Sequence, residues 1–198
     1  MEKTIWADHT IINQHLSGNQ QAFTALVKKH RPGIYQFILK CIQNHEDTKD
    51  LSQKVFIKCY KGLTELRDKT NFKSWLFRIA RNQVIDYQRS LKDIKNIDDL
   101  TTDDSEAQQI FSTDFNPEMA SDVVFRKKVI YRAINQLPHE QKEVIVMKIY
   151  SQMTFAEISK VVDVSENTIK SRCYYGLTSI KKILKKWNFQ EYGYHEMY

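Results

Sequence analysis

Apolar side chains recur every three or four residues through most of this chain, and this spacing constrains its fold more than any other feature. An α-helix places residues with this spacing on one face, whereas a half-buried strand needs strict alternation, which this sequence shows only in short ambiguous runs. With only 5 Gly and 3 Pro among its residues, the chain is also poor in the tight turns that a β-rich fold requires. The sequence therefore predicts an all-α protein.

The charged residues divide the chain into three parts. Residues 93–122 hold nine acidic side chains and one lysine, while segments 1–92 and 123–198 each carry a basic excess. The acidic stretch has no clear helical periodicity, which is typical of a linker. We therefore expect two small helical domains, 1–92 and 123–187, joined by an acidic flexible linker over 93–122. An aromatic tail follows at 188–198.

Composition and spacing argue against several classes of protein. No apolar run approaches the roughly 18 residues of a membrane-spanning helix, and residues 1–10 lack the apolar core of a signal peptide. We therefore expect a cytoplasmic protein with no membrane insertion. The three cysteines are widely separated and are expected to be reduced and buried. The six histidines show no ligand spacing, so no metal, cofactor or enzymatic activity is indicated.

The first domain is expected to contain four helical segments. Asp8 is a candidate cap for the first of them. The second extends over about 19–44 with an interruption at Pro32, because proline removes a helical hydrogen bond. The third and fourth extend over about 46–62 and 71–90. Together they predict a compact helical bundle.

Basic and aromatic side chains alternate in the fourth segment and in the loop before it. This pattern suits single-stranded nucleic acid, because bases stack on aromatic faces and cations neutralise phosphates. The alternative is that the aromatic residues belong to the core and the cations only solvate the helix. Phe72 is expected to be core, whereas both interpretations stay open for Trp75. The residues concerned are Arg67, Lys69, Phe72, Lys73, Trp75, Phe77, Arg78, Arg81, Tyr87 and Arg89.

The second domain ends in the most informative stretch of the chain. Thr154 and Glu157 have capping-box spacing before a short segment, and Ser165 caps a longer one after a brief turn. This order predicts a helix-turn-helix, whose second helix enters the DNA major groove. An amphipathic helix with a basic solvent face is the alternative. The expected buried face comprises Ile169, Cys173, Leu177, Ile180 and Leu184, and the outward face comprises Asn167, Lys170, Ser171 and Tyr174, flanked by Arg172.

Three blocks of sequence, in this order, resemble bacterial sigma factors of the extracytoplasmic-function (ECF) group, the small class with only regions 2 and 4. The first block is 50–56 (DLSQKVF), similar to the region 2 segment that docks on RNA polymerase. The second is 72–82 (FKSWLFRIARN), followed by Asp86 and Arg89. The third joins Leu137-Pro138 to the helix-turn-helix. Lys54 departs from the family pattern, which usually has an acidic residue there.

The resemblance implies a protein without catalysis of its own that binds core RNA polymerase, reads the −35 promoter element as duplex DNA and melts the −10 element. It implies polymerase binding by Asp50, Leu51, Gln53 and Phe56, although Leu51 and Phe56 can instead be core. The implied −10 contacts are Arg67, Lys69, Asn71, Lys73, Trp75, Arg78, Arg81, Asn82 and Arg89. The implied −35 contacts are Ser165, Asn167, Thr168, Lys170, Ser171, Arg172, Tyr174 and Tyr175.

Partners and an alternative function follow from the same comparison. The resemblance implies an inhibitory anti-sigma factor, which in this group is often membrane-bound. The alternative is a free-standing helix-turn-helix regulator that binds duplex DNA without polymerase. That alternative accounts for residues 123–186 but gives no role to the basic and aromatic cluster around Trp75.

Overall fold

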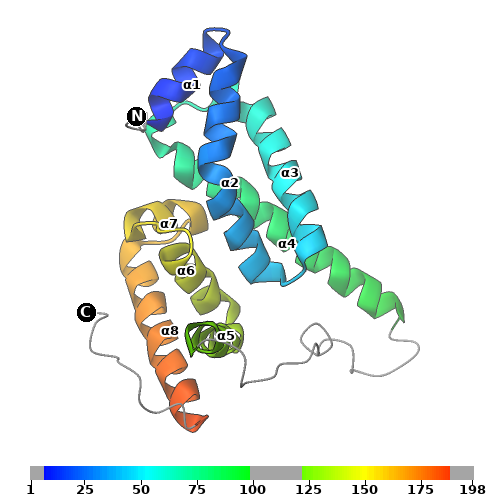
Figure 1. The fold of residues 1–198 in the computed structure, drawn as a ribbon, viewed down its shortest axis with the longest axis vertical. Coiled ribbons are helices and arrows are strands. Elements are labelled where there is room, and N and C mark those ends of the chain that lie inside the picture. Colours follow the sequence, from blue (N-terminus) through cyan, green and yellow to red (C-terminus); the bar gives the residue numbers. More distant parts are fainter. Residues whose placement is uncertain (1–6, 99–121, 188–198) are drawn as a thin grey trace.

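The computed structural model describes residues 7–98 and 122–187, and every regular element in these two ranges is helical (Figure 1). The prediction of an all-α fold is confirmed for this part of the chain. The N-terminal domain comprises α1 (Asp8–Leu16), α2 (Gln20–Ile42), α3 (His45–Gly62), the 3-10 turns η1 (Leu63–Glu65) and η2 (Lys69–Asn71), and α4 (Phe72–Asp98). The C-terminal domain comprises α5 (Asp122–Asn135), α6 (His139–Ile149), α7 (Phe155–Val162) and α8 (Glu166–Lys186).

The N-terminal domain is built around α2, against which α1, α3 and α4 pack. Asn19 and Asn44 cap α2 and α3, because the Asn19 side-chain oxygen accepts one backbone N–H hydrogen bond of the first helical turn and that of Asn44 accepts two. Phe37 and Phe77 meet edge to face with ring centroids 5.6 Å apart. Phe72 is 1% exposed, which confirms that it belongs to the core.

The interruption expected at Pro32 is not observed, since α2 is continuous from Gln20 to Ile42. Pro32 itself is exposed, so its missing N–H leaves the unpaired carbonyl of the preceding turn close to water. Leu26 and Ile34, on either side of the proline, are fully buried. Packing of this face outweighs the local cost of one proline.

Asp8 also differs from its expected role as a helix cap, because Ala7 is the N-cap of α1. The Asp8 carboxylate instead accepts a hydrogen bond from His30 Nε2 at 3.0 Å and lies 2.8 Å from Lys29 Nζ. Burial alone would raise the pKa of Asp8, but the hydrogen bonds from His30 and Lys29 outweigh it and lower this pKa. The contact ties α1 to the middle of α2.

In the C-terminal domain α8 packs against α5, α6 and α7. Ile169, Cys173, Ile180 and Leu184 are buried as expected, but Leu177 is 44% exposed. Gly176 takes its place in the interface, where a Cβ atom would lie 3.1 Å from Ile145 Cγ1. The glycine therefore lets α8 approach α6 closely, which a count of apolar positions could not predict.

The two domains contact each other, with α4 along α7 and α2 against α6 (Figure 1). Helix α4 continues to Asp98 and so extends past the boundary expected at 92. The remainder of the acidic linker (99–121) and the aromatic tail (188–198) lie outside the described residues. None of the described helices is long and apolar enough to cross a membrane.

Candidate nucleic-acid interface

Asp68 organises the loop that leads into α4. Its carboxylate accepts hydrogen bonds from the Thr70 backbone N–H at 3.0 Å, from the Thr70 hydroxyl at 2.5 Å and from the Asn71 side-chain amide. These bonds, that of the Thr70 hydroxyl first, lower the pKa of Asp68. Asp68 is not among the predicted site residues, although an Asp two positions before Thr is a common signal for a side-chain-capped turn. Lys69, in the same loop, donates to Asn13 Oδ1 of α1 at 2.7 Å.

Trp75 is half-buried, so its environment is intermediate between the core and surface positions that the sequence left open. Its ring centroid lies 5.9 Å from that of Phe72, and a Cβ atom built on Gly62 would come within 3.2 Å of its Cζ2 atom. The indole therefore packs on the rim of the core, while part of it remains accessible to solvent.

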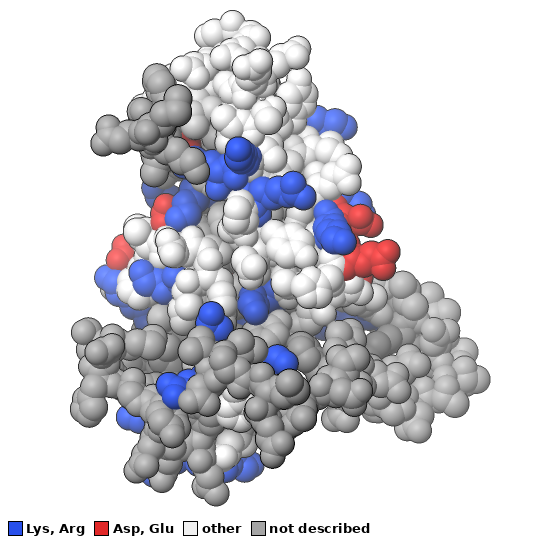
Figure 2. All heavy atoms as spheres, in the orientation of Figure 1, with Lys and Arg blue, Asp and Glu red and all other residues white. Residues whose placement is uncertain are grey.

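The other predicted −10 residues spread along the loop and α4. Figure 2 shows that most charged side chains on the face turned toward the viewer in Figure 1 are Lys or Arg. Arg67, Asn82 and Arg89 are exposed, with Arg89 beside His139 in a small surface hollow. Asn71, Lys73, Arg78 and Arg81 instead face the C-terminal domain and are hydrogen-bonded to it. The structure thus gathers the four on one side of η2 and α4, but against the C-terminal domain rather than in an open groove.

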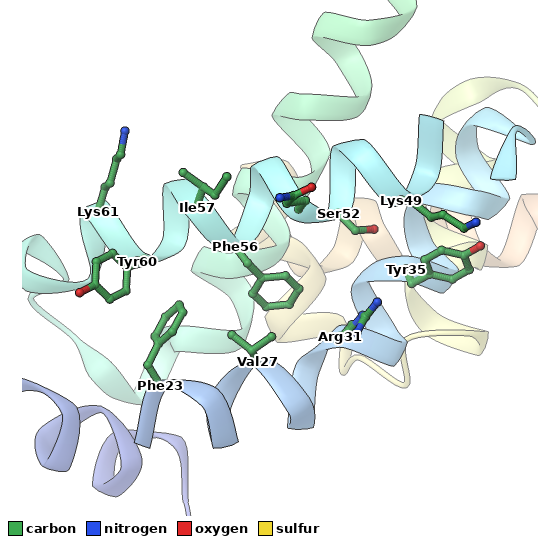
Figure 3. A pocket seen from close by; sticks show the side chains of 11 residues that line it. Phe23, Val27, Arg31, Tyr35, Lys49, Ser52, Phe56, Ile57, Tyr60 and Lys61 are labelled. Atoms are coloured by element: carbon green, nitrogen blue, oxygen red, sulfur yellow. The ribbon is translucent and has the colours of Figure 1, made fainter. Parts of the chain in front are cut away.

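A groove of about 540 Å³ lies between α2 and α3 and holds part of the predicted polymerase-binding set (Figure 3). Phe56 points from α3 toward Val27 of α2, and Gln53 lines the same groove. Asp50 is exposed, but Leu51 is 6% exposed and belongs to the core. Exposed apolar and basic side chains complete the lining, among them Ile57, Tyr60, Arg31, Lys49 and Lys61.

Only the α3 wall of this groove was predicted from the sequence. The other wall consists of α2 residues Phe23, Val27, Arg31 and Tyr35, which no recognised motif marked. Their spacing of four residues along one helix is the available signal, because such residues lie on one face.

The helix-turn-helix has the local geometry that the sequence predicted. Thr154 and Glu157 form a complete capping box at the start of α7. Helix α7 ends at Val162, and its C-cap Asp163 has a φ of 62°, in the left-handed region. Ser165 then caps α8 by accepting a hydrogen bond from the Thr168 N–H at 3.1 Å. These caps fix the sharp change of direction between the two helices.

The outward face of α8 is polar and largely exposed to solvent. Tyr174 and Tyr175 are 68% and 59% exposed, and their rings meet edge to face. Lys170 forms an exposed pair with Glu166, with 2.8 Å between Nζ and Oε1. The predicted residues that are exposed on this helix and its cap are Ser165, Asn167, Thr168, Lys170, Ser171, Tyr174 and Tyr175.

Arg172 does not lie on that open face. Its side chain is 20% exposed, and its Nη2 atom lies 2.8 Å from Glu140 Oε2 of α6. The Ser165 and Thr168 hydroxyls are 2.8 Å apart and take part in the helix cap. The side chains available for reading bases are therefore fewer than the sequence alone indicated.

Metal-ligating and thiol groups are considered in the described ranges. No group of three or more His, Cys, Asp or Glu side chains in residues 7–98 and 122–187 could hold a metal ion. Burial raises the pKa of the Cys41 and Cys59 thiols to about 12, so both remain protonated near neutral pH.

A helix-turn-helix with an exposed polar face, joined to a helical domain whose α4 carries a row of cations around the half-buried Trp75, is typical of a nucleic-acid-binding protein of the transcription class. The family description "Sigma-70 region 2" matches residues 26–94, and "Sigma-70, region 4" matches residues 127–178, so the two cover more than half of the chain. The chain belongs to the sigma-70 family of RNA polymerase sigma factors, in its ECF group.

Several individual proteins are similar over most of their length. The chain is 28% identical to the ECF RNA polymerase sigma factor SigW of Bacillus subtilis, over 88% of this chain and 95% of SigW. It is 25% identical to the ECF RNA polymerase sigma-E factor of Escherichia coli K12, over 84% and 88% of the two chains. Among solved structures, its fold is similar to CnrH in complex with the cytosolic domain of CnrY, with a TM-score of 0.67, 20% identity and coverage of 91% and 99%. A sigma factor RpoE bound to the anti-sigma factor NepR from Bartonella quintana also gives 0.67, with 21% identity and coverage of 83% and 98%.

Proposed function

We propose that this chain is a promoter-specificity subunit, which binds core RNA polymerase, reads a −35 element as duplex DNA and opens a −10 element. The observation that carries the proposal is the presence in one chain of a capped helix-turn-helix and of a second domain whose α4 carries a row of cations around the half-buried Trp75. A regulator that only binds duplex DNA needs the first feature and gives no role to the second. The polymerase supplies the catalysis, and this chain supplies recognition.

The −35 contacts are assigned to the open face of α8. Asn167, Lys170 and Ser171 carry donors and acceptors suited to base edges, and they lie in the N-terminal half of the helix that enters the major groove. Lys181 and Lys182, further along the same helix, suit phosphate contacts. The exposed rings of Tyr174 and Tyr175 offer apolar contact for thymine methyl groups.

The −10 function is assigned to the Asp68 loop and the beginning of α4. Removing a base from the stack costs a few kcal/mol, which stacking and neutralised phosphates must offset. The accessible part of Trp75 supplies an aromatic face, and Arg67, Asn82 and Arg89 are exposed for the strand. The set also includes four residues that are available to the strand only when their hydrogen bonds to the C-terminal domain are broken: Asn71, Lys73, Arg78 and Arg81.

Polymerase binding is assigned to the groove between α2 and α3, which Gln53 lines, and to the exposed residue Asp50 of α3. The lining combines apolar side chains, notably Phe56 and Ile57, with basic groups at the rim. This combination suits a helical partner with an apolar stripe and acidic flanks. Leu51, being buried, positions α3 and does not touch the partner.

An inhibitory protein partner and a cytoplasmic location also belong to the proposal. Two proteins of similar fold are described in complexes with CnrY and with the anti-sigma factor NepR. Affinity purification of this chain from uninduced native cells should therefore return a second protein that blocks polymerase binding. Repeated recovery of the chain alone would contradict this part of the proposal.

Titration of the labelled chain with sigma-free core RNA polymerase tests the proposed function. We expect saturable binding that Ile57→Asp weakens about tenfold or more, because Ile57 is 47% exposed in the groove and a charge there replaces an apolar contact. Leu91→Asp is the matched control, since Leu91 is 42% exposed on α4 and is not a lining residue of the groove. Duplex DNA binding with no polymerase binding would instead favour the free-standing regulator.

A further inference from the structure

The Lys69 side chain, in the loop that precedes α4, is bonded to a helix that is distant from it in the sequence. Its ammonium donates to Asn13 Oδ1 of α1 at 2.7 Å, and the two residues are 56 positions apart. Helix α1 also packs beside η2, the 3-10 turn that carries Lys69 (Figure 1). One of the residues assigned to the −10 strand is therefore held by α1, to which the proposed function assigns no role.

The loop side of this contact is fixed by Asp68. The Asp68 carboxylate accepts hydrogen bonds from the Thr70 backbone N–H at 3.0 Å and from the Asn71 side-chain amide. Lys69 lies inside the turn that these bonds close, and its side chain is half-buried. The lysine therefore extends from a backbone that is held in a defined conformation.

Helix α1 is in turn anchored to the rest of the domain at both of its ends. At its N-terminal end Asp8 accepts a hydrogen bond from His30 Nε2 at 3.0 Å. At its C-terminal end the centroid of the His15 ring lies 5.4 Å from that of Phe23. Asn13 therefore extends from a fixed helix, and both partners of the Asn13–Lys69 bond are held in place.

Lys69 differs from several other lysines of the chain in the charge of its partner. Lys29, Lys73 and Lys170 each lie within 3.5 Å of a carboxylate oxygen, whereas Lys69 binds an amide oxygen of Asn13. A carboxylate compensates the positive charge of an ammonium, but an amide orients the ammonium and leaves its charge intact. An ammonium has three donors, so two remain for other acceptors while Asn13 is bound.

An ammonium that is oriented and not compensated is suited to a phosphate oxygen. A lysine side chain has a long flexible stem, and immobilising such a side chain at an interface lowers affinity by roughly two- to tenfold. The bond to Asn13 orders the Lys69 side chain before a strand arrives, so part of this loss is avoided.

We propose that Asn13 is a positioning residue of the −10 site, which holds the Lys69 ammonium ready for a phosphate of the single strand without compensating its charge. The choice of the strand as ligand rests on the proposed function, whereas the Asn13–Lys69 contact does not. Helix α1 thereby forms a wall of the −10 site, although none of its residues was among the predicted contacts. Asn13 is exposed, so its substitution leaves the core of the domain intact.

Carbodiimide cross-linking of the Asn13→Asp chain tests the contact without DNA. This reagent joins an amine to a carboxylate without a spacer, so we expect a peptide in which positions 13 and 69 are linked. Gln14→Glu is the matched control, because the next position on a helix points about 100° away. Absence of the linked peptide from the Asn13→Asp chain, or equal yields from the two variants, would overturn the contact, whatever the result with DNA.

Binding of a labelled oligothymidine to the purified chain tests the role of the contact, because phosphate contacts do not depend on sequence. Lys69→Ala and Asn13→Ala should each weaken binding, the latter by about threefold. The chain with both substitutions should bind as weakly as Lys69→Ala alone, because Asn13 acts through Lys69. Gln14→Ala, at the neighbouring exposed position of α1, is the matched control and should bind like the natural chain.

The outcomes of this double-mutant cycle separate the inference from the function on which it rests. Additive losses, or normal binding by the Asn13→Ala chain, would overturn the positioning role alone. If Lys69→Ala lost no affinity, the assignment of Lys69 to the strand would fail, and the inference would fail with it.

Asn13→Asp in the same binding assay separates orientation from charge. The new carboxylate still accepts a hydrogen bond from Lys69 but compensates its charge, so this variant should bind oligothymidine more weakly than Asn13→Ala does. Binding by Asn13→Asp equal to that of the natural chain would overturn the need for a neutral partner.

Discussion

The indole of Trp75 rests against Phe72 and beside Gly62, with part of its surface accessible to solvent. Trp75→Ala should leave polymerase binding unchanged, because the groove between α2 and α3 is elsewhere on the domain. It should slow opening of a duplex promoter by about tenfold or more, because one stacking partner worth about 1–3 kcal/mol is lost. Stopped-flow fluorescence of a probe in the −10 region measures the opening.

A promoter with an already unpaired −10 segment is the decisive control for Trp75→Ala. It should restore most of the lost transcription, since base flipping is then no longer required. Thermal unfolding of the variant separates this effect from lost packing of the ring. If the unpaired promoter gave no rescue, the role of Trp75 in melting would be refuted.

Lys170 and Lys182 are both exposed lysines on α8, but they are assigned different tasks. Lys170→Ala should change which −35 base pairs are preferred, because this residue lies in the helical half that meets base edges. Its exposed pair with Glu166 is no obstacle, because such pairs contribute little. Lys182→Ala should weaken binding to all sequences alike. Selection from a randomised −35 duplex library distinguishes these results, and equal, sequence-independent losses would place Lys170 with the phosphate contacts.

At the scale of the elements, α8 shows what a periodic pattern can and cannot predict. The helix, its Ser165 cap and most of its buried face could be predicted, because capping and spacing are local properties of the sequence. The sequence could not show that Gly176, rather than Leu177, lies in the interface, because this depends on how closely α6 and α8 approach each other. At Pro32 the local signal was misleading. Proline predicts an interruption of the helix, but packing of the buried residues on both sides keeps α2 continuous.

The close approach of α6 and α8 predicts a strong asymmetry between two neighbouring positions. Gly176→Leu should destabilise the C-terminal domain by about 1–3 kcal/mol, because the new side chain overpacks an interface where even a Cβ lies 3.1 Å from Ile145. Leu177→Ala, at an exposed position of the same helix, should change stability little. Urea unfolding followed by circular dichroism measures both, and comparable losses would contradict the assigned packing.

The Asp8 contact between α1 and α2 predicts a pH-dependent stability. Because the pKa of Asp8 is lowered on folding, its contribution is present above the unfolded value of about 3.9 and is lost as pH falls through the folded pKa. Asp8→Asn should therefore cost about 1–2 kcal/mol at neutral pH. The difference from the natural chain should vanish at acidic pH. A difference in melting temperature that stayed constant from neutral to acidic pH would contradict this account.

At the scale of the whole molecule, the sequence predicted the two helical domains but not their mutual contact. Arg81 and Glu143 are 62 positions apart and lie in different domains, so no local pattern links them. The same cations that suit a nucleic-acid strand also suit the oxygens of a neighbouring domain, and charge alone does not distinguish these partners. The sequence could therefore identify Lys73, Arg78 and Arg81 as a cationic set, but not the group they bind in the free chain.

The groove between α2 and α3 could likewise be predicted only in part from the sequence. Its α3 wall carries the recognisable Asp50–Phe56 block, whereas the α2 wall is an ordinary amphipathic helix face. Only the packing of the two helices makes Val27 and Tyr35 part of the same surface as Phe56. The sequence left open whether Leu51 is core or a partner contact, and the packing of the helices makes it core.

Transcription by sigma-free core RNA polymerase supplemented with this chain, on genomic fragments of its own host, tests the central claim most directly. We expect transcripts that begin at defined sites and share related sequences about one and about three helical turns upstream. Transcripts should be absent without the chain and should be lost with Ile57→Asp but kept with Leu91→Asp. Duplex DNA binding without polymerase association or defined start sites would contradict the account and favour a free-standing regulator.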